Sequence, residues 1–363
     1  MGIFFIKRYL ILDEDNSKTQ FGNMIRTFFS NLTKNMGIDL GTANTIVLQR
    51  NSDSLINEPS VIALDKTGSL VALGDEAKKM LGKTHPGLLV LRPMADGVIA
   101  DFMAAEQMIK GFIREAGIPR ILINKMVVGV PTGITAVERR AVIDSAFSSG
   151  ARRVYLVAEP MAAAIGVGLD VLGPDAMMIV DIGGGTTDIA VINYGGIVLD
   201  NTLRIAGDEM NEALIRFFKN KFHLNIGLQT AERIKIEYGI ASKEAKCEKF
   251  DVQGMDIQTN LPRRIKVDSG IFLEAFELIF DTISNAVLGA LDQLPPELAS
   301  DLIDRGIVLT GGGSMLKGMD TFLREKIKIP VSIPANALFC VAEGTREILE
   351  DFKRFEPILF SRT

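Results

Sequence analysis

The sequence has few of the residues that build disulfide frameworks or metal sites. Two cysteines, Cys247 and Cys340, and two histidines, His85 and His223, occur in 363 residues. The cysteines lie far apart and lack zinc-site spacing, which indicates a reducing, cytosolic compartment. The histidines form no cluster. We therefore expect neither a disulfide scaffold nor a metal held by histidine side chains.

The chain also lacks a long apolar run and an excess of basic residues. Its first apolar segment, residues 3–12, contains Lys7 and Arg8, is too short to span a bilayer, and has no signal-peptide cleavage site. The formal net charge of −5 offers no general attraction to nucleic acid. A composition of 47% hydrophobic and 23% charged residues is typical of a folded globular protein, and the length suffices for two domains.

Two common phosphate-binding motifs are missing as well. No G-x-x-x-x-G-K-[ST] occurs, which excludes a P-loop. The glycine-rich stretch at residues 180–192 lacks G-x-G-x-x-G spacing and returns into a strand, where a dinucleotide-binding fold would begin a helix.

That glycine-rich stretch reads V-D-I-G-G-G-T-T-D-I-A-V-I and predicts strand, tight turn and strand. Glycines let backbone N–H groups approach an anion, and threonine hydroxyls can donate to phosphate. An aspartate beside phosphates requires a cation between them, so Asp181 indicates Mg²⁺ held through its water shell. An ordinary glycine-rich hairpin would also explain this stretch if it stood alone.

The same pattern occurs a second time. Residues 38–48 read I-D-L-G-T-A-N-T-I-V-L, so that Asp39 corresponds to Asp181, and a third glycine turn, T-G-G-G-S-M, occupies residues 310–315. Two matching hairpins predict two related halves that face each other across a nucleotide. Strands alternate with helices throughout, which predicts an α/β protein with mostly parallel or mixed sheets covered on both faces. One long helix is predicted over residues 271–291.

The N-terminal 35 residues differ from this regular plan. Over residues 24–35 a helix is predicted, with Ile25, Phe28, Phe29 and Leu32 on one face. Two interpretations remain open: the helix packs on its own domain, or it lies in a membrane surface. Residues 1–23 are open to a further interpretation, an extension upstream of a start at Met24.

Taken together, the motifs resemble the actin, heat-shock chaperone and sugar kinase ATPase superfamily and, within it, the bacterial actins of the MreB family. The similarity covers roughly residues 36–350. It is carried by I-D-L-G-T-A-N-T (38–45), N-E-P-S-V (57–61), R-P-M-A-D-G-V-I-A-D (92–101), V-E-R-R-A-V (137–142), E-P-M-A-A-A-I-G (159–166), V-D-I-G-G-G-T-T (180–187), A-G-D-E-M (206–210), T-A-E-R-I-K-I-E (230–237) and L-T-G-G-G (309–313).

The resemblance implies an actin-like ATPase fold, with two similar α/β domains and the nucleotide in the cleft between them. The first domain would comprise residues 36–170 and a C-terminal helix at 341–355, with a small subdomain at about 65–90. The second would comprise residues 171–340, with a small subdomain at about 208–270.

The resemblance also implies roles for individual residues. The phosphates would be held by Thr42, Ala43 and Asn44 from the first half and by Gly184, Gly185 and Thr186 from the second. The adenosine would be flanked by Glu232, Arg233, Ile234 and Lys235 on one side and by Gly312, Gly313, Ser314 and Met315 on the other. Asp39 and Asp181 would organise Mg²⁺. Glu159 would position or activate the hydrolytic water, with Thr186 and Asp181 assisting.

Simpler interpretations exist for some of these residues. Glu159 is also explained as a carboxylate at a helix N-terminus, and Glu232 and Lys235 as an exposed helical charge face. Ile121 and Leu122 lie in a shorter version of a loop that in relatives enters the membrane, and a core strand explains them equally well.

The function implied is that of an ATP- and Mg²⁺-dependent, slow ATPase that polymerises into filaments. It would lie at the inner face of the cytoplasmic membrane and, with membrane proteins of cell-wall elongation, organise peptidoglycan synthesis and maintain cell shape, without a nucleic-acid partner. The alternative is a soluble small-molecule kinase of the same superfamily. A chaperone ATPase is disfavoured because the sequence has no room for a peptide-binding domain.

Overall fold

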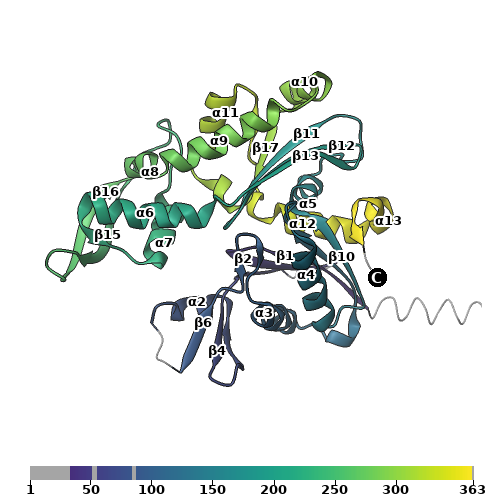
Figure 1. Ribbon diagram of the computed structural model, residues 1–363, viewed down its shortest axis with the longest axis horizontal. Helices are drawn as coiled ribbons and strands as arrows, with labels where there is room; N and C mark the ends of the chain where they lie inside the picture. The colour runs from purple at the N-terminus through teal and green to yellow at the C-terminus, as the bar shows by residue number, and fades with distance from the viewer. Residues whose placement is uncertain (1–32, 51–54, 84–86, 362–363) are drawn as a thin grey trace, which may run out of the picture.

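The computed structural model describes residues 33–50, 55–83 and 87–361, which form two α/β halves (Figure 1). Most of the predicted N-terminal helix, including Ile25, Phe28, Phe29 and Leu32, lies outside these residues. Its last two residues, Lys34 and Asn35, are not helical: they begin strand β1 (Lys34–Leu40) and pair with β9 (Ile123–Val130). The helix prediction is therefore wrong for Lys34 and Asn35, whose backbone belongs to the sheet.

The first half is built on a mixed six-stranded sheet with the order β19-β10-β9-β1-β2-β3. Strands β1, β9 and β10 run parallel, and β2, β3 and β19 are antiparallel to their neighbours. Its other strands are β2 (Asn44–Gln49), β3 (Leu55–Pro59), β10 (Arg153–Ala158) and β19 (Phe360–Ser361).

The second half repeats this sheet. Its five strands have the order β13-β12-β11-β17-β18, which corresponds to β3-β2-β1-β9-β10 in both sequence and direction. They are β11 (Met177–Ile182), β12 (Thr187–Asn193), β13 (Gly196–Leu203), β17 (Ile307–Thr310) and β18 (Val331–Ser332). The duplication predicted from the two aspartate hairpins is thus present in the strand topology.

Helices cover both faces of the first sheet and one face of the second, whose other face packs against the helix Glu159–Gly166 of the first half. In the first half these are α3 (Phe102–Glu115), α4 (Ala136–Ser148), α5 (Glu159–Gly166), α12 (Cys340–Glu350) and α13 (Phe352–Phe355). In the second they are α6 (Gly207–Phe222), α7 (Leu228–Tyr238), α8 (Gly270–Ala275), α9 (Glu277–Leu291), α10 (Pro296–Arg305) and α11 (Met319–Ile327). Four 3-10 helices connect elements: η1 (Arg120–Leu122), η2 (Gly312–Met315), η3 (Ala337–Phe339) and η4 (Glu356–Ile358).

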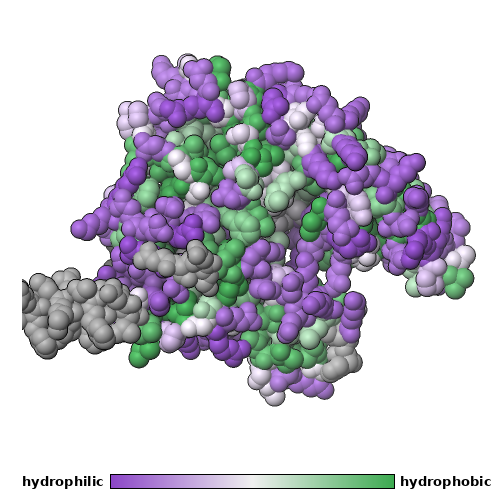
Figure 2. Space-filling view, turned by 180° about the vertical axis from the view of Figure 1, so that it is seen from behind, coloured by the Kyte–Doolittle hydropathy of each residue, from purple (hydrophilic) through white to green (hydrophobic). Residues whose placement is uncertain are grey.

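Each half carries a small sheet beside the central cleft. On the first half, β4 (Ile62–Asp65), β5 (Leu70–Leu73) and β6 (Leu88–Leu91) pack with helix α2 (Gly74–Met80). On the second, β14 (Leu224–Asn225), β15 (Lys249–Asp256) and β16 (Pro262–Asp268) form the small sheet. The surface is hollowed between these two parts, and hydrophilic residues cover most of that face (Figure 2).

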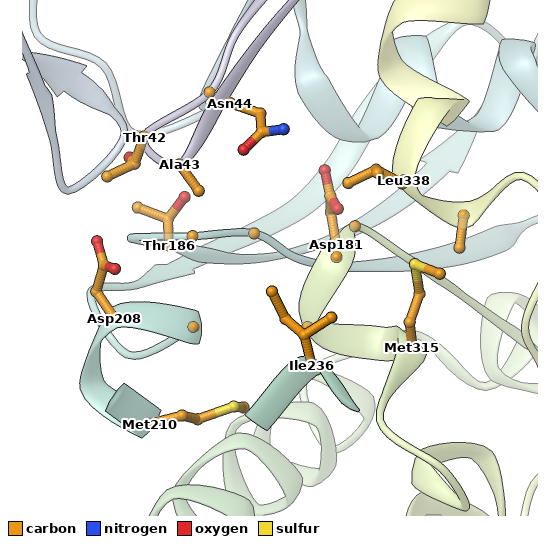
Figure 3. A pocket seen from close by; sticks show the side chains of 18 of the residues that line it. Thr42, Ala43, Asn44, Asp181, Thr186, Asp208, Met210, Ile236, Met315 and Leu338 are labelled. Atoms are coloured by element: carbon orange, nitrogen blue, oxygen red, sulfur yellow. The ribbon is translucent and has the colours of Figure 1, made fainter. Parts of the chain in front are cut away.

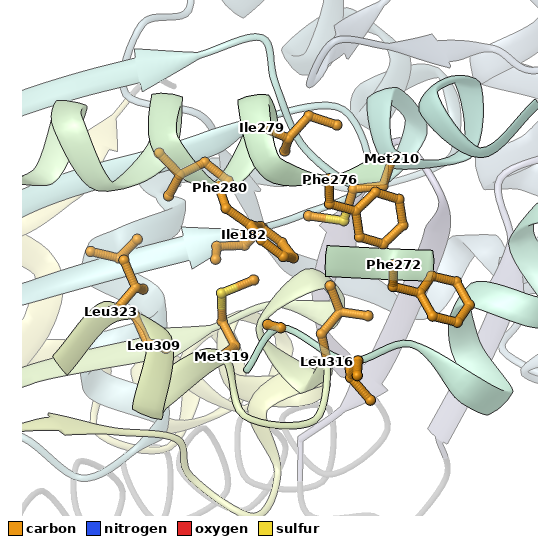
Figure 4. Close-up of a cluster of buried hydrophobic side chains, with 14 of the residues drawn as sticks. Ile182, Met210, Phe272, Phe276, Ile279, Phe280, Leu309, Leu316, Met319 and Leu323 are labelled. Atoms are coloured by element: carbon orange, nitrogen blue, oxygen red, sulfur yellow. The ribbon is translucent and has the colours of Figure 1, made fainter. Parts of the chain in front are cut away.

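In the described part of the chain, three large hydrophobic cores hold these layers together, and there are two smaller apolar clusters. One lies in the first half and includes Phe112, and one in the second half is centred on Phe272, Phe276 and Phe280 (Figure 4). The third contains α5 and α12, and it joins Val127 of the first sheet to Ile179 of the second. The contact between the halves therefore includes a packed apolar layer.

Two predicted helices are each divided in the structure. The helix predicted over residues 271–291 is divided at Phe276 into α8 and α9. The C-terminal helix is likewise divided at Asp351 into α12 and α13. Strand β3 ends at Pro59 and β4 begins at Ile62, and between them the Ser60 hydroxyl donates to the carbonyl of Gly41.

The segment around Ile121 is not a core strand. Ile121 lies in η1 with 74% of its surface exposed, and the sheet begins two residues later at Ile123. Among the described residues, none of the helices has the length and apolar character needed to cross a membrane.

Candidate functional site

The two aspartate hairpins meet at one cavity of about 370 Å³ between the halves (Figure 3). The first hairpin contributes Thr42, Ala43 and Asn44, and the second contributes Gly184 and Thr186. Cavities of this size bind small molecules in many proteins. The sequence placed these residues in two separate motifs, and the structure brings them to one surface.

The glycines of the second hairpin are explained by close packing. A Cβ added at Gly184 would lie 2.7 Å from the Cβ of Ala43, and one at Gly185 would lie 2.8 Å from the Oγ1 of Thr42. No side chain fits in either place. Gly185 does not line the cavity, so its contribution to the site is this close approach of the hairpins.

The N-E-P-S stretch at residues 57–60 holds the first hairpin in place. The Nδ2 of Asn44 donates to the Oδ1 of Asn57 at 2.7 Å, and the hydroxyl of Ser60 donates to the carbonyl of Gly41 at 2.6 Å. These bonds fix the turn that carries Thr42 and Ala43. The motif thus positions the site without reaching the cavity itself.

Four acidic groups gather beneath the hairpins: Asp39, Glu159, Asp181 and Asp188. Burial raises the pKa of Asp39 to about 7, and burial with the charges of Asp188 and Asp39 raises the pKa of Asp181 to about 7. The pKa of Glu159 is raised well above its usual range by burial and by the charges of Asp188, Asp39 and Asp181. Such crowding of carboxyl groups is typical of sites that bind cations or transfer protons.

The donor set fits a cation bound through water. The Oδ1 of Asp181 is buried and has no hydrogen-bond partner in the part of the chain that the structure describes. A buried acceptor of this kind is normally satisfied by an ion or an ordered water. Among the described residues, no three His, Cys, Asp or Glu side chains are grouped to hold a metal ion directly. Mg²⁺ keeps several waters and uses only one or two carboxylates, which matches Asp39 and Asp181.

Asp188 lies opposite Asp181 on the neighbouring strand and has hydroxyl partners of its own. Its Oδ1 accepts from the Oγ1 of Thr202 at 2.6 Å and from that of Thr132 at 3.4 Å. Thr132 belongs to the first half, so this carboxylate links the halves. Its charge remains close enough to Glu159 to raise the pKa of that group.

Helix α7 presents only one face to the cavity. Glu232, Lys235 and Ile236 line it at helical spacing, whereas Ile234 is buried in the core and Arg233 pairs outward with Glu237 at 3.0 Å. The four consecutive residues chosen from the sequence therefore divide between three environments. The 3.6-residue period of the motif would have indicated Ile236 in place of Arg233 and Ile234.

Glu232 and Lys235 are both engaged in polar contacts. The carboxylate of Glu232 lies 2.8 Å from the Nζ of Lys78 on the opposite half, and the Nζ of Lys235 donates to the carbonyl of Gly207 at 2.6 Å. Burial lowers the pKa of Lys235 to about 8. An exposed charge face, the simpler interpretation of these two residues, does not describe them.

The third glycine turn forms the far wall of the cavity. Gly312, Gly313 and Met315 line it, and Figure 3 shows Met315 and Ile236 on the side away from Thr42 and Ala43. Ser314 does not line the cavity, because its hydroxyl donates to the carbonyl of Gly311 at 2.7 Å in the buried turn.

Several lining residues were not predicted from the sequence, including Asp208, Met210 and Asn211. They follow the second hairpin directly: the N–H of Asp208, in the first turn of α6, donates to the carbonyl of Gly184 at 2.7 Å. The A-G-D-E-M motif at residues 206–210 was the available signal, since it contains Asp208 and Met210.

Comparison with known proteins places this site in a family. The family model described as MreB/Mbl protein matches residues 33–357. The chain belongs to the MreB/Mbl family. The cell shape-determining protein MreB of Escherichia coli (strain K12) is 43% identical to this MreB/Mbl chain over 350 residues, which cover 93% of the chain and 99% of that protein. The cell shape-determining protein Mbl of Bacillus cereus (strain ATCC 10987 / NRS 248) is 43% identical over 328 residues, 88% of the chain and 97% of that protein.

The crystal structure of MreB 5 of Spiroplasma citri bound to AMPPNP superposes on this MreB/Mbl chain with a TM-score of 0.84. The two sequences are 32% identical, and the superposition covers 90% of this chain and 98% of the MreB 5 chain. The predicted fold class, an actin-like pair of similar α/β domains, is confirmed by this likeness and by the duplicated sheets.

Proposed function

We propose that this MreB/Mbl protein is a bacterial actin that binds ATP in the cleft, polymerises, hydrolyses ATP slowly and acts in cell shape. The observation that carries the proposal is the meeting of the two aspartate hairpins at one cavity, with buried carboxyl groups beneath them. The nucleotide bound to MreB 5 of Spiroplasma citri and the cell-shape role in the names of the MreB and Mbl relatives support it.

In this proposal the phosphates lie between Thr42, Ala43 and Asn44 on one side and Gly184 and Thr186 on the other. The adenosine lies between α7, with Glu232 and Lys235, and the third glycine turn. Asp39 and Asp181 hold the waters of Mg²⁺, which neutralises phosphate charge when it is bound. Because contacts come from both halves, ATP favours the closed arrangement of the molecule. We propose that this closed arrangement is the one that assembles.

Assembly gives a direct test. The full chain should sediment at high speed with ATP and Mg²⁺ and stay in the supernatant with EDTA. Asp181→Asn removes the negative acceptor without changing the size of the side chain, so this variant should remain soluble under both conditions. A parent protein that never sediments and shows only monomers by electron microscopy would contradict the filament proposal and favour the small-molecule kinase.

Membrane association is a separate part of the proposal. We infer that Ile25, Phe28, Phe29 and Leu32 insert into the inner face of the cytoplasmic membrane, where membrane proteins of cell-wall elongation would be the partners. Full burial of an apolar side chain is worth about 1.5–3 kcal/mol, and partial insertion of a short helix gives a weak anchor. A filament presents many anchors at once, which makes the attachment firm.

Phe28→Glu combined with Phe29→Glu should therefore abolish flotation with anionic liposomes while ATP-dependent sedimentation without lipid persists. Sedimentation with ATP in the absence of lipid is the internal control, because it shows whether the variant has lost only the membrane anchor or also the ability to form filaments. A helix packed on its own domain predicts the reverse, with a lower unfolding temperature and impaired ATP hydrolysis. If the double variant floats as the parent does, the exposed Ile121 is the next residue to change.

A further inference from the structure

The stretch R-P-M-A-D-G-V-I has no role in the site described so far, although it crosses the cleft. Residues 92–99, here called the strap, connect the small sheet of the first half to α3. Two short strands, β7 (Met94–Ala95) and β8 (Val98–Ile99), pair within it. The turn between them has left-handed backbone at both Asp96, with φ of 51°, and Gly97, with φ of 75°. This tight turn projects over the phosphate end of the cavity, which Gly97 lines.

The strap touches both phosphate hairpins. The N–H of Gly97 donates to the Oγ1 of Thr42 at 2.9 Å. A Cβ added at Gly97 would lie 3.0 Å from the Cγ2 of Thr186, and one added at Gly185 would lie 3.0 Å from the Cα of Asp96. With no free space between these groups, the second hairpin cannot withdraw from the first without also separating from the strap.

Two ion pairs tie the strap to the second half. The Nη1 of Arg92 lies 3.1 Å from Oδ1 and 3.3 Å from Oδ2 of Asp208, and both side chains are partly buried, with 21% and 29% of their surface exposed. The Nη1 of Arg204 lies 3.7 Å from the Oδ2 of Asp96, in a more exposed position. The strap thus contributes the cation of one pair, Arg92, and the anion of the other, Asp96, and residues 204–208 contribute the opposite charge in each pair. The Arg92 pair is the stronger, because it is less exposed to solvent than the Arg204 pair and contacts both carboxylate oxygens.

We propose that Arg92 and Asp208 are positioning residues of the nucleotide site, whose ion pair holds the strap across the closed cleft and so slows the release of ATP. The inference rests on the proposed binding of ATP. Neither residue needs to touch the phosphates for this role. The ion pair must break when the cleft opens, so a stronger pair raises the activation barrier for the dissociation of ATP.

The test is the dissociation rate of a fluorescent ATP analogue, N-methylanthraniloyl-ATP, chased from the full chain by unlabelled ATP with Mg²⁺. Arg92→Gln and Asp208→Asn should each speed release by roughly tenfold, which corresponds to about 1.4 kcal/mol. The double variant should release no faster than either single one, since each change removes the same pair. Arg92→Lys, which keeps the charge, should restore much of the slow release.

Arg140→Gln is the matched control, because Arg140 forms an ion pair with Asp144 at 2.8 Å within α4 and does not cross the cleft. It should release the analogue at the parent rate. If Asp208→Asn releases the analogue at the parent rate, the proposal is overturned. Faster release from Arg92→Gln alone would then be explained by repulsion between the phosphates and an Asp208 carboxylate that has lost its partner. Additive effects in the double variant would overturn it too. A parent protein that takes up no analogue would contradict the proposed ATP binding instead.

Discussion

Glu159→Gln should bind ATP about as tightly as the parent protein and hydrolyse it ~10²–10⁴-fold more slowly, the usual cost of losing a general base. Glu159 is the first residue of α5 and lines the cavity together with Asp39 and Asp181. Its raised pKa moves the carboxylate toward the range in which it can accept a proton from water. Glutamine keeps the size and hydrogen-bonding capacity of the side chain but cannot take up that proton.

Single-turnover release of phosphate, measured beside binding of the fluorescent ATP analogue, separates the two steps. The parent rate should rise with pH through the pKa of Glu159, because the base acts only when it is deprotonated, and the variant should lose the part of this dependence that Glu159 contributes. The competing interpretation makes Glu159 a carboxylate that stabilises the N-terminus of α5, worth about 0.3–1 kcal/mol. Under that interpretation the variant loses slight stability and hydrolyses ATP at the parent rate, an outcome that would sink the catalytic assignment.

Gly344→Ala should destabilise the protein by about 3 kcal/mol or more, the upper end of the cost of overpacking a core. Helices α5 and α12 cross with their backbones in contact: a Cβ added at Gly344 would lie 1.8 Å from the carbonyl oxygen of Ala162. From the other side, a Cβ added at Gly166 would lie 2.0 Å from the carbonyl oxygen of Cys340. Both partners are helix backbone, which cannot turn aside as a side chain would. The helices must separate, and α5 carries Glu159.

Gly289→Ala provides the matched control for this prediction. Gly289 lies inside α9, and a Cβ added there meets no atom within 4 Å. Replacing a free helical glycine by alanine should stabilise the protein by about 0.5–1 kcal/mol. Thermal unfolding of the two variants and the parent, without nucleotide, measures both effects. Equal unfolding temperatures for Gly344→Ala and the parent would show that the crossing can loosen at no cost.

The sequence by itself determined the duplicated plan and the chemistry of the hairpins. Asp39 and Asp181 are each the last residue but one of a strand that leads into a turn, and this pattern depends only on residues that are neighbours along the chain. The strand order repeats in both halves, as the two copies predicted. The local sequence pattern was also sufficient to identify the MreB/Mbl family, because each of the family's motifs is one contiguous segment of the chain.

Tertiary structure alone decided which members of each motif reach the cavity. Glu232 and Lys235 reach it while Arg233 and Ile234 do not, because packing against the second core fixes the rotation of α7. Gly185 allows the two hairpins to pack closely. Arg92 of the strap contacts Asp208, which lies 116 positions away in the sequence. Such contacts depend on how two halves with separate cores pack against each other. The spacing of residues along the chain does not show which residues of one half will meet which residues of the other.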